Sequence, residues 1–98
     1  MDIEISKTDP KIAHFHKITE GMTETFTAKN HDYGDSFGQS LDEFGLVASV
    51  VRLGDKINRI KSLTRQEGQV KDESVKDTLL DMANYAIMTV MWMENQER

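Results

Sequence analysis

The stretch DESVKDTLLDMANYAIMTVMWM at residues 72–93 decides the fold that we expect for this chain. A helix that is apolar on one stripe packs on one neighbour, whereas a helix that is apolar nearly all round is buried on several sides. The second half of this stretch is of the latter kind. Its apolar residues are Leu79, Leu80, Met82, Ala83, Ala86, Ile87, Met88, Val90, Met91, Trp92 and Met93. We therefore expect a long helix over residues 72–94 that other helices surround.

The same stretch carries acidic side chains on one helix face. Asp77 and Asp81 are four positions apart, and Asn84 continues this face seven positions after Asp77. Carboxylates on a helix that is bound for the interior need a partner, which is an arginine or lysine, a metal ion or water. The functional question is which of these partners the chain supplies.

Length and composition narrow the class of protein. The 98 residues suit one domain. The net charge of −5 argues against binding to a nucleic-acid backbone, which needs a basic face. The absence of cysteine excludes a disulfide framework and a thiol nucleophile. The N-terminal segment is polar, unlike a signal peptide, and no apolar run is long enough to span a bilayer, so we expect a cytoplasmic protein with no membrane partner.

A first helix is predicted over residues 10–29. The pair Asp9-Pro10 is typical of a helix start, and apolar residues then recur every three or four positions. Residues 1–8 before it are expected to form a flexible tail. Asparagine, aspartates and glycines at residues 30–39 predict a structured turn.

A second helix is predicted over residues 40–65, because Ser40 and Glu43 have the spacing of a capping box. Gly45 and Gly54 fall inside it, and each costs about 1 kcal/mol relative to alanine in a continuous helix. The helix therefore bends or breaks near one of them, or a glycine permits the close approach of another backbone.

These elements predict an all-α fold, a small antiparallel bundle of three main helices. Three helices, of which the last is apolar nearly all round, do not close a core easily. The simplest solution is packing against further copies of the chain, which predicts a homodimer or a larger homo-oligomer.

Charged faces of the second and third helices form a candidate site. A short loop between antiparallel helices would bring the two faces together, and they would then bind phosphate through cations and Mg²⁺ through carboxylates. The alternative is a ladder of interhelical ion pairs that binds nothing. The candidate phosphate ligands are Arg52, Lys56 and Arg59, and the candidate metal ligands are Asp55, Asp77 and Asp81.

The turn that follows the first helix offers further contacts. Gly34 permits a positive φ, Tyr33 offers a stacking surface and Asp32 offers hydrogen-bond acceptors. One interpretation is that this turn covers the base or sugar of a nucleotide, and the other is that it only packs between helices. No catalytic residue is assigned, because the chain has no phosphate loop or other strong enzyme signature.

Three short motifs, in chain order, carry a resemblance to a known family. They are YGDSF at residues 33–37, KINRIKSL at residues 56–63 and DMANYAI at residues 81–87. Their combination resembles nucleotide-modification-associated domain one, a small domain of phages and bacteria, over about residues 29–93. The resemblance implies a role in nucleotide metabolism, in which Asn84 would hydrogen-bond the nucleotide.

Residues 72–87 also look similar to the last metal-binding helix of the MazG-like all-α nucleoside-triphosphate pyrophosphohydrolases. This similarity implies Mg²⁺-dependent cleavage between the α- and β-phosphates, with Asp81 and Asp77 in the second metal-binding motif. The chain departs from the first motif of those enzymes, because the equivalent stretch holds Asp55 beside the basic residues Lys56 and Arg59. Such neighbours satisfy carboxylates without a metal and would hold phosphates directly.

Three functions follow as alternatives. The first is a Mg²⁺-dependent nucleotide pyrophosphohydrolase. The second is a non-enzymatic binder that sequesters a nucleotide signal, as a phage sponge against host defence would. The third is a structural or interaction module whose charges form ion pairs only.

Overall fold

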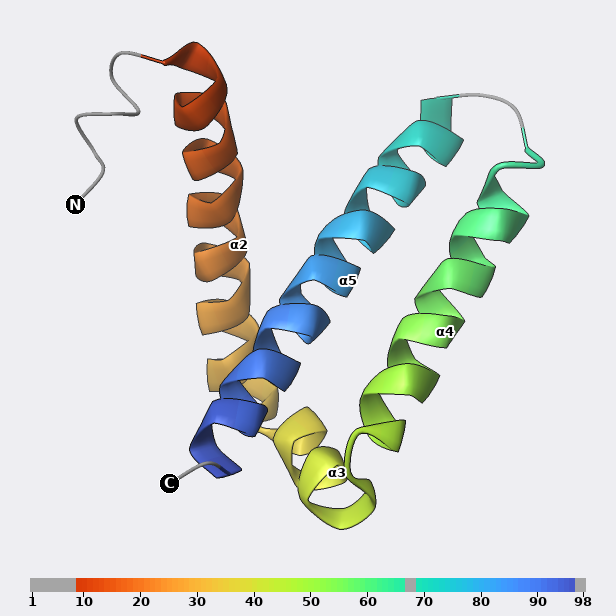
Figure 1. Ribbon diagram of the computed structural model, residues 1–98. Helices are drawn as coiled ribbons and strands as arrows, with labels where there is room; N and C mark the ends of the chain where they lie inside the picture. Colours follow the sequence, from red (N-terminus) through yellow and green to blue (C-terminus); the bar gives the residue numbers. More distant parts are fainter. Residues whose placement is uncertain (1–8, 67–68, 97–98) are drawn as a thin grey trace. The chain divides into compact units, whose positions relative to one another are not determined.

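The computed structural model describes residues 9–66 and 69–96, and these residues form helices (Figure 1). The helices are α2 (Pro10–Tyr33), α3 (Ser36–Phe44), α4 (Val47–Leu63) and α5 (Gln69–Gln96). The all-α class is thereby confirmed, and the described residues form four helices instead of three main ones because the second predicted helix is broken. The predicted flexible tail at residues 1–8 lies outside the described residues.

The chain divides into two compact units between Gly34 and Asp35. The first unit contains α2, and the second contains α3, α4 and α5. The grouping of both units into one domain stays a prediction. In the part of the chain that is described, no helix combines the length and the apolar character that a membrane span requires.

The start of α2 is the one that the sequence predicts. Asp9 Oδ1 accepts a hydrogen bond from the backbone N–H of Lys11 at 2.9 Å, and Pro10 occupies the first helical position, where no N–H is needed. The helix continues past residue 29 to Tyr33, where Gly34 ends it with a φ of 71°. The predicted turn at residues 30–39 is thus reduced to residues 34–35.

The predicted helix over residues 40–65 is two helices, of which α3 begins before Ser40. Asp35 caps α3, because its Oδ1 accepts a hydrogen bond from the backbone N–H of Gly38 at 3.1 Å. Ser40 lies inside α3 and donates its hydroxyl to the carbonyl of Ser36 at 3.2 Å. The capping-box prediction was therefore wrong, since an aspartate upstream supplies the cap.

Gly45 separates α3 from α4. Its φ is 70°, and its N–H donates to the carbonyl of Leu41 at 2.8 Å, which ends α3. Of the alternatives that the sequence left open, a break at Gly45 is the one observed. Gly54 lies inside α4, which continues unbroken through it.

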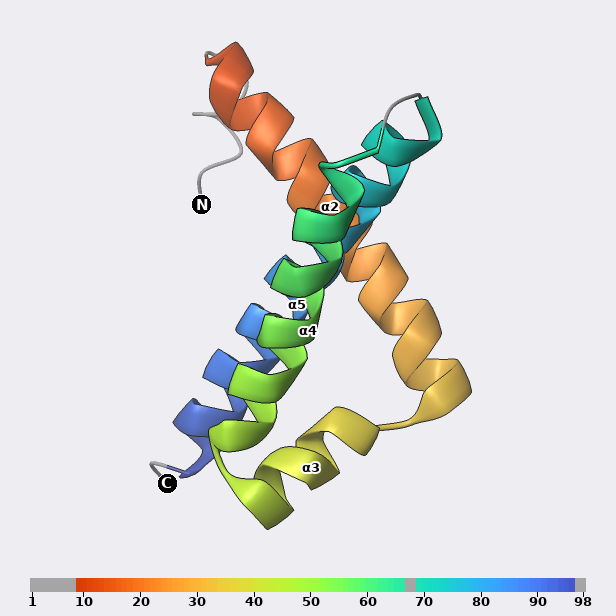
Figure 2. The same ribbon diagram turned by 90° about the vertical axis from the view of Figure 1, so that its right-hand side faces the viewer.

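The helices α4 and α5 lie side by side and antiparallel, and α3 packs against both (Figures 1 and 2). The hydroxyl oxygens of Ser49, near the start of α4, and Thr89, near the end of α5, are 2.9 Å apart. Trp92 Nε1 donates a hydrogen bond to Asp42 Oδ1 at 2.9 Å and connects α5 to α3. The described apolar residues of this unit that are buried are Phe37, Leu41 and Leu63.

Candidate functional site

A row of cations on α4 is directed at α5. Arg52, Lys56 and Arg59 are four and three positions apart, which places them on one helix face. Each of them contacts a side chain of α5. The interhelical contact that the sequence predicts for these three residues is therefore present.

The ring of Tyr85 is contacted by two of these cations. The guanidinium carbon of Arg52 is 5.3 Å from the centroid of the Tyr85 ring, and Lys56 Nζ is 6.0 Å from it. Both distances fall within the range in which a cation is attracted by an aromatic face. Phe37 of α3 meets the same ring edge-on, with centroids 4.9 Å apart and an interplanar angle of 72°. The position of the Tyr85 ring is thus set by side chains of two other helices.

The polar partners of Lys56 and Arg59 lie about one turn apart on α5. Lys56 Nζ is 3.2 Å from Asp81 Oδ2, and the two side chains are 23% and 31% exposed. Arg59 Nε donates a hydrogen bond to Thr78 Oγ1 at 3.3 Å, while Thr78 donates to the carbonyl of Ser74 at 2.7 Å. These bonds hold the ends of two long side chains in fixed directions.

We call this arrangement the cationic seam. It consists of Arg52, Lys56, Arg59, Thr78, Asp81 and Tyr85. Within it three cations face a single carboxylate, in a chain whose net charge is −5. Arg52 and Arg59 are exposed to solvent, so their guanidinium groups can bind a planar or tetrahedral anion while they keep their contacts to α5.

The predicted metal ligands are not grouped in the same way. Asp55 and Asp77 are exposed, whereas Asp81 is half-buried and paired with Lys56. Among the described residues, no three histidine or acidic side chains lie close enough together to hold a metal ion. The described residues of one chain therefore do not fit a three-carboxylate site, and a role for Mg²⁺ stays a prediction.

The remaining predicted contact residues do not form part of the seam or have side chains that are not described. Asp32 belongs to the unit of α2, where its Oδ1 is 3.2 Å from His31 Nδ1, and both side chains are exposed. The side chain of Tyr33 lies outside the described part of the chain. Asn84 is half-buried on α5 and does not belong to the seam.

Two residues of the seam were missed by the sequence analysis. The face that was expected on α5 ran from Asp77 through Asp81 to Asn84, whereas the observed contacts run from Thr78 through Asp81 to Tyr85. The signal for the correct face was the pair of threonines at 78 and 89. Both are buried, and each occupies a position in line with Asp81 and Tyr85.

The sequence of this chain matches the family described as nucleotide modification associated domain 1 over residues 29–93. The match covers most of the chain, and the chain belongs to this family. The matched range includes all six residues of the cationic seam. No curated protein and no solved structure matched the chain.

Membership in this family associates the chain with a nucleotide-related role. The similarity to MazG-like pyrophosphohydrolases has no counterpart in these comparisons and stays a prediction.

Proposed function

We propose that the cationic seam binds the phosphate groups of a nucleotide directly, and that the protein is a nucleotide binder. The observation that supports this most strongly is the row of Arg52, Lys56 and Arg59, which is held along α5 by Tyr85, Asp81 and Thr78. Arginine and lysine bind phosphate by charge-assisted hydrogen bonds, and the arginine fork does so at two oxygens at once.

The seam is suited to this task because its cations are oriented before a ligand arrives. Arg52 rests on an aromatic ring and Arg59 is bonded to Thr78, so binding a phosphate requires little further ordering of either side chain. The ion pair of Lys56 with Asp81 is half-buried. The ammonium group of Lys56 is therefore less hydrated than that of an exposed lysine.

Titration calorimetry with ATP and with inorganic tripolyphosphate, in EDTA, tests the proposal. We expect both probes to bind and Arg59→Ala to weaken each by about tenfold or more, since a hydrogen bond to a charged group is lost. Lys61→Ala is the matched control, because Lys61 is an exposed cation of α4 outside the seam. An equal loss of affinity in both variants would contradict a specific role for the seam.

A pyrophosphohydrolase is the second candidate, because the family association does not separate binding from cleavage and Asp81 lies among the cations. The two functions predict opposite effects of Asp81→Asn. In a binder this variant removes the charge that neutralises Lys56, and tripolyphosphate binds more tightly. In a Mg²⁺-dependent hydrolase it removes a metal ligand, and turnover is lost.

Incubation with a pool of nucleoside triphosphates, cyclic nucleotides and ADP-ribose-type signals separates these outcomes. A binder returns its nucleotide intact when the protein is denatured, with or without Mg²⁺. Conversion to a monophosphate and pyrophosphate, only with Mg²⁺, would replace the binder by the hydrolase. If no nucleotide is depleted and a double-mutant cycle shows an energetic coupling between Lys56 and Asp81, the protein is a structural module whose charges form ion pairs only.

A further inference from the structure

Several side chains that form contacts between α4 and its neighbour α5 are followed directly in the sequence by an apolar residue. Val50 directly follows Ser49, and Ile57 directly follows Lys56 on α4. On α5, apolar residues directly follow Thr78, Tyr85, Thr89 and Trp92 in the same way. We call these six residues the apolar face: Val50, Ile57, Leu79, Ala86, Val90 and Met93.

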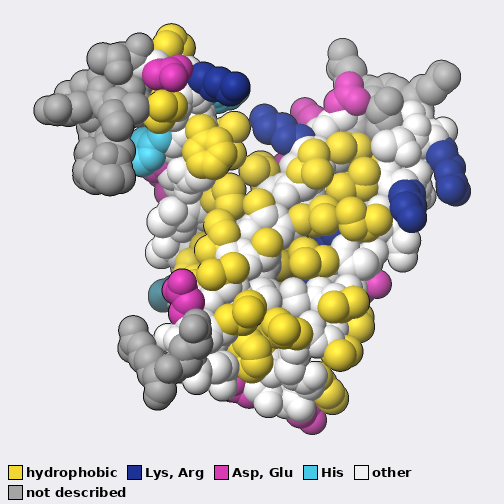
Figure 3. Space-filling view, in the orientation of Figure 1, with side chains coloured by type: hydrophobic (Ala, Val, Ile, Leu, Met, Phe, Trp, Pro, Cys, Tyr) yellow, Lys and Arg dark blue, Asp and Glu magenta, His cyan; other side chains and the backbone are white. Residues whose placement is uncertain are grey.

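The six residues lie on one side of the α4–α5 pair. Each is offset by one residue, about 100° of helix rotation, from a side chain at or beside the contact between the two helices. Because the helices are antiparallel and the offset has the same sense on both, the two halves of the face lie on the same side. Figure 3 shows hydrophobic side chains spread over both helices on one face of this unit.

This face is exposed. Val50 is 68% exposed, and Leu79 and Val90 are 53% and 52% exposed. Together the six side chains expose roughly 500 Å², which is near the largest apolar patch that a typical monomer leaves uncovered.

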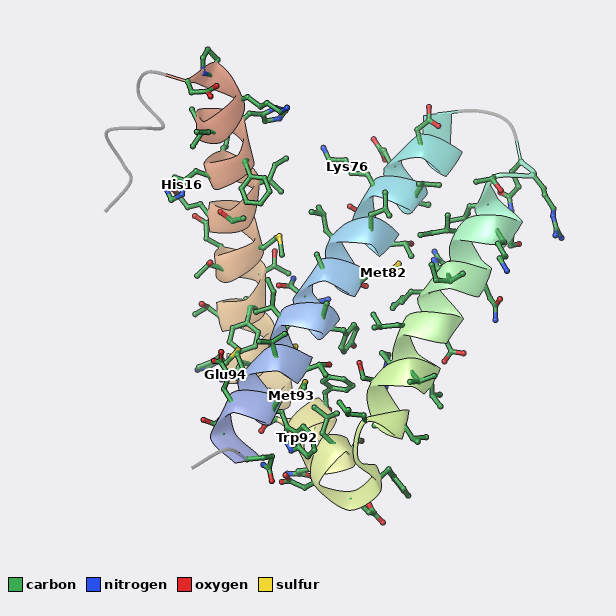
Figure 4. All side chains as sticks on the ribbon, in the orientation of Figure 1. His16, Lys76, Met82, Trp92, Met93 and Glu94 are labelled. Carbon is green, nitrogen blue, oxygen red and sulfur yellow. The ribbon has the colours of Figure 1, made fainter. Side chains whose placement is uncertain are left out.

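The ends of α5 carry opposite charges beside this face. Lys76 and Glu94, both labelled in Figure 4, are exposed and lie near opposite ends of α5. They are 18 positions apart, which is five turns, so they lie on the same side of the helix and about 27 Å from each other. Neither forms an ion pair with any residue that the structure describes.

We propose that a second copy of this chain covers the apolar face, with the two α5 helices antiparallel about a two-fold axis near Tyr85. This arrangement is self-complementary. It sets Leu79 of one copy near Val90 of the other, and it sets Lys76 beside Glu94 of the second copy at both ends. A two-fold contact uses the same surface twice, and on this surface apolar residues meet apolar residues and each charge meets an opposite charge.

Light scattering of the full chain tests the proposal first. The expected mass is twice 11.2 kDa. Val90→Asp places two carboxylates in the apolar contact and should weaken association by a hundredfold or more. A mass of one chain for the wild type across the micromolar range would overturn the proposal, and so would an unchanged mass for Val90→Asp that retains its helical circular dichroism.

Charge reversal at the ends of α5 provides a second test that does not depend on the fold of a core variant. Lys76→Glu or Glu94→Lys alone sets like charges side by side at both ends and should raise the dissociation constant about tenfold. The double variant restores opposite charges and should return the constant to that of the wild type. Rescue must act between chains, because the two residues are too far apart to meet within one helix.

The alternative to a second copy is that α2 covers the apolar face, and one variant distinguishes these two arrangements. Phe15 of α2 is 71% exposed. Phe15→Asp should leave the mass and the dissociation constant unchanged. Dissociation of the dimer by Phe15→Asp but not by Val90→Asp, or no rescue in the double charge reversal, would contradict the proposed interface.

Discussion

Tyr85 joins α3, α4 and α5 through its ring. The ring lies on α5, its edge contact comes from Phe37 of α3, and its cations come from α4. An aromatic pair contributes about 0.5–1.5 kcal/mol beyond the burial of its surface, and each cation at a partly exposed site contributes about 0.5–1 kcal/mol. One side chain therefore carries a large share of the specific contacts of this unit.

Replacing the ring tests this role. Tyr85→Leu keeps an apolar side chain but removes all the ring contacts, and we expect the free energy of unfolding to fall by about 2 kcal/mol. Tyr85→Phe keeps the ring and should change this free energy by less than about 0.5 kcal/mol. Urea denaturation followed by circular dichroism measures both, and equal losses in the two variants would show that the ring contacts do not stabilise the fold.

Gly45 is the residue whose backbone conformation ends α3. Its φ of 70° lies in the left-handed region, where a side chain costs about 1–2 kcal/mol. We expect Gly45→Ala to lower the melting temperature. Gly21→Ala is the matched control, because Gly21 is inside α2 and an added methyl group meets nothing within 4 Å, so this variant should raise the melting temperature slightly. A rise in both variants would contradict the role of Gly45 as the end of α3.

At the scale of the elements, two hydroxyl groups connect the first turn of α4 to the last turns of α5. Ser49 and Thr89 are both buried and bonded to each other, and Thr89 also donates to the carbonyl of Tyr85 at 2.8 Å. A buried hydroxyl that loses its partner costs about 1–3 kcal/mol, whereas removing both members of a pair costs less. Because of this difference, the coupling energy between the two hydroxyl groups can be measured.

A double-mutant cycle tests the interaction of Ser49 with Thr89. Thr89→Val leaves the Ser49 hydroxyl buried without this partner and should cost about 1–2 kcal/mol of unfolding free energy. Adding Ser49→Ala should recover part of that loss, which gives a coupling of at least about 0.5 kcal/mol. Strictly additive losses would mean that water or another group satisfies the two hydroxyls.

The elements also show what sequence reasoning could reach. The start of α2 was predictable, because its cap is local and Asp9 and Pro10 act within one turn. The separation of α3 from α4 was harder to predict, since a glycine in a periodic pattern is compatible with a continuous helix, a bend or a break. The spacing of Ser40 and Glu43 then favoured the wrong start, because Asp35 supplied a stronger cap upstream.

At the scale of the whole molecule, half of the candidate site was predictable. The cations of α4 follow from their own spacing, because three basic residues on one face must meet whatever packs there. The face of α5 depends on how that helix is rotated in the packed unit, and a shift of one residue exchanges Asp77 for Thr78. In a helix that is apolar nearly all round, the apolar pattern does not fix this rotation, and only the packed structure does.

The central claim is that the cationic seam binds phosphate, and one measurement tests it most directly. It is the affinity for inorganic tripolyphosphate in EDTA, measured by calorimetry for the wild type, Arg59→Ala, Asp81→Asn and Lys61→Ala. We predict weaker binding in Arg59→Ala, tighter binding in Asp81→Asn and no change in Lys61→Ala. Binding that is absent without Mg²⁺, or that falls rather than rises in Asp81→Asn, would contradict the account.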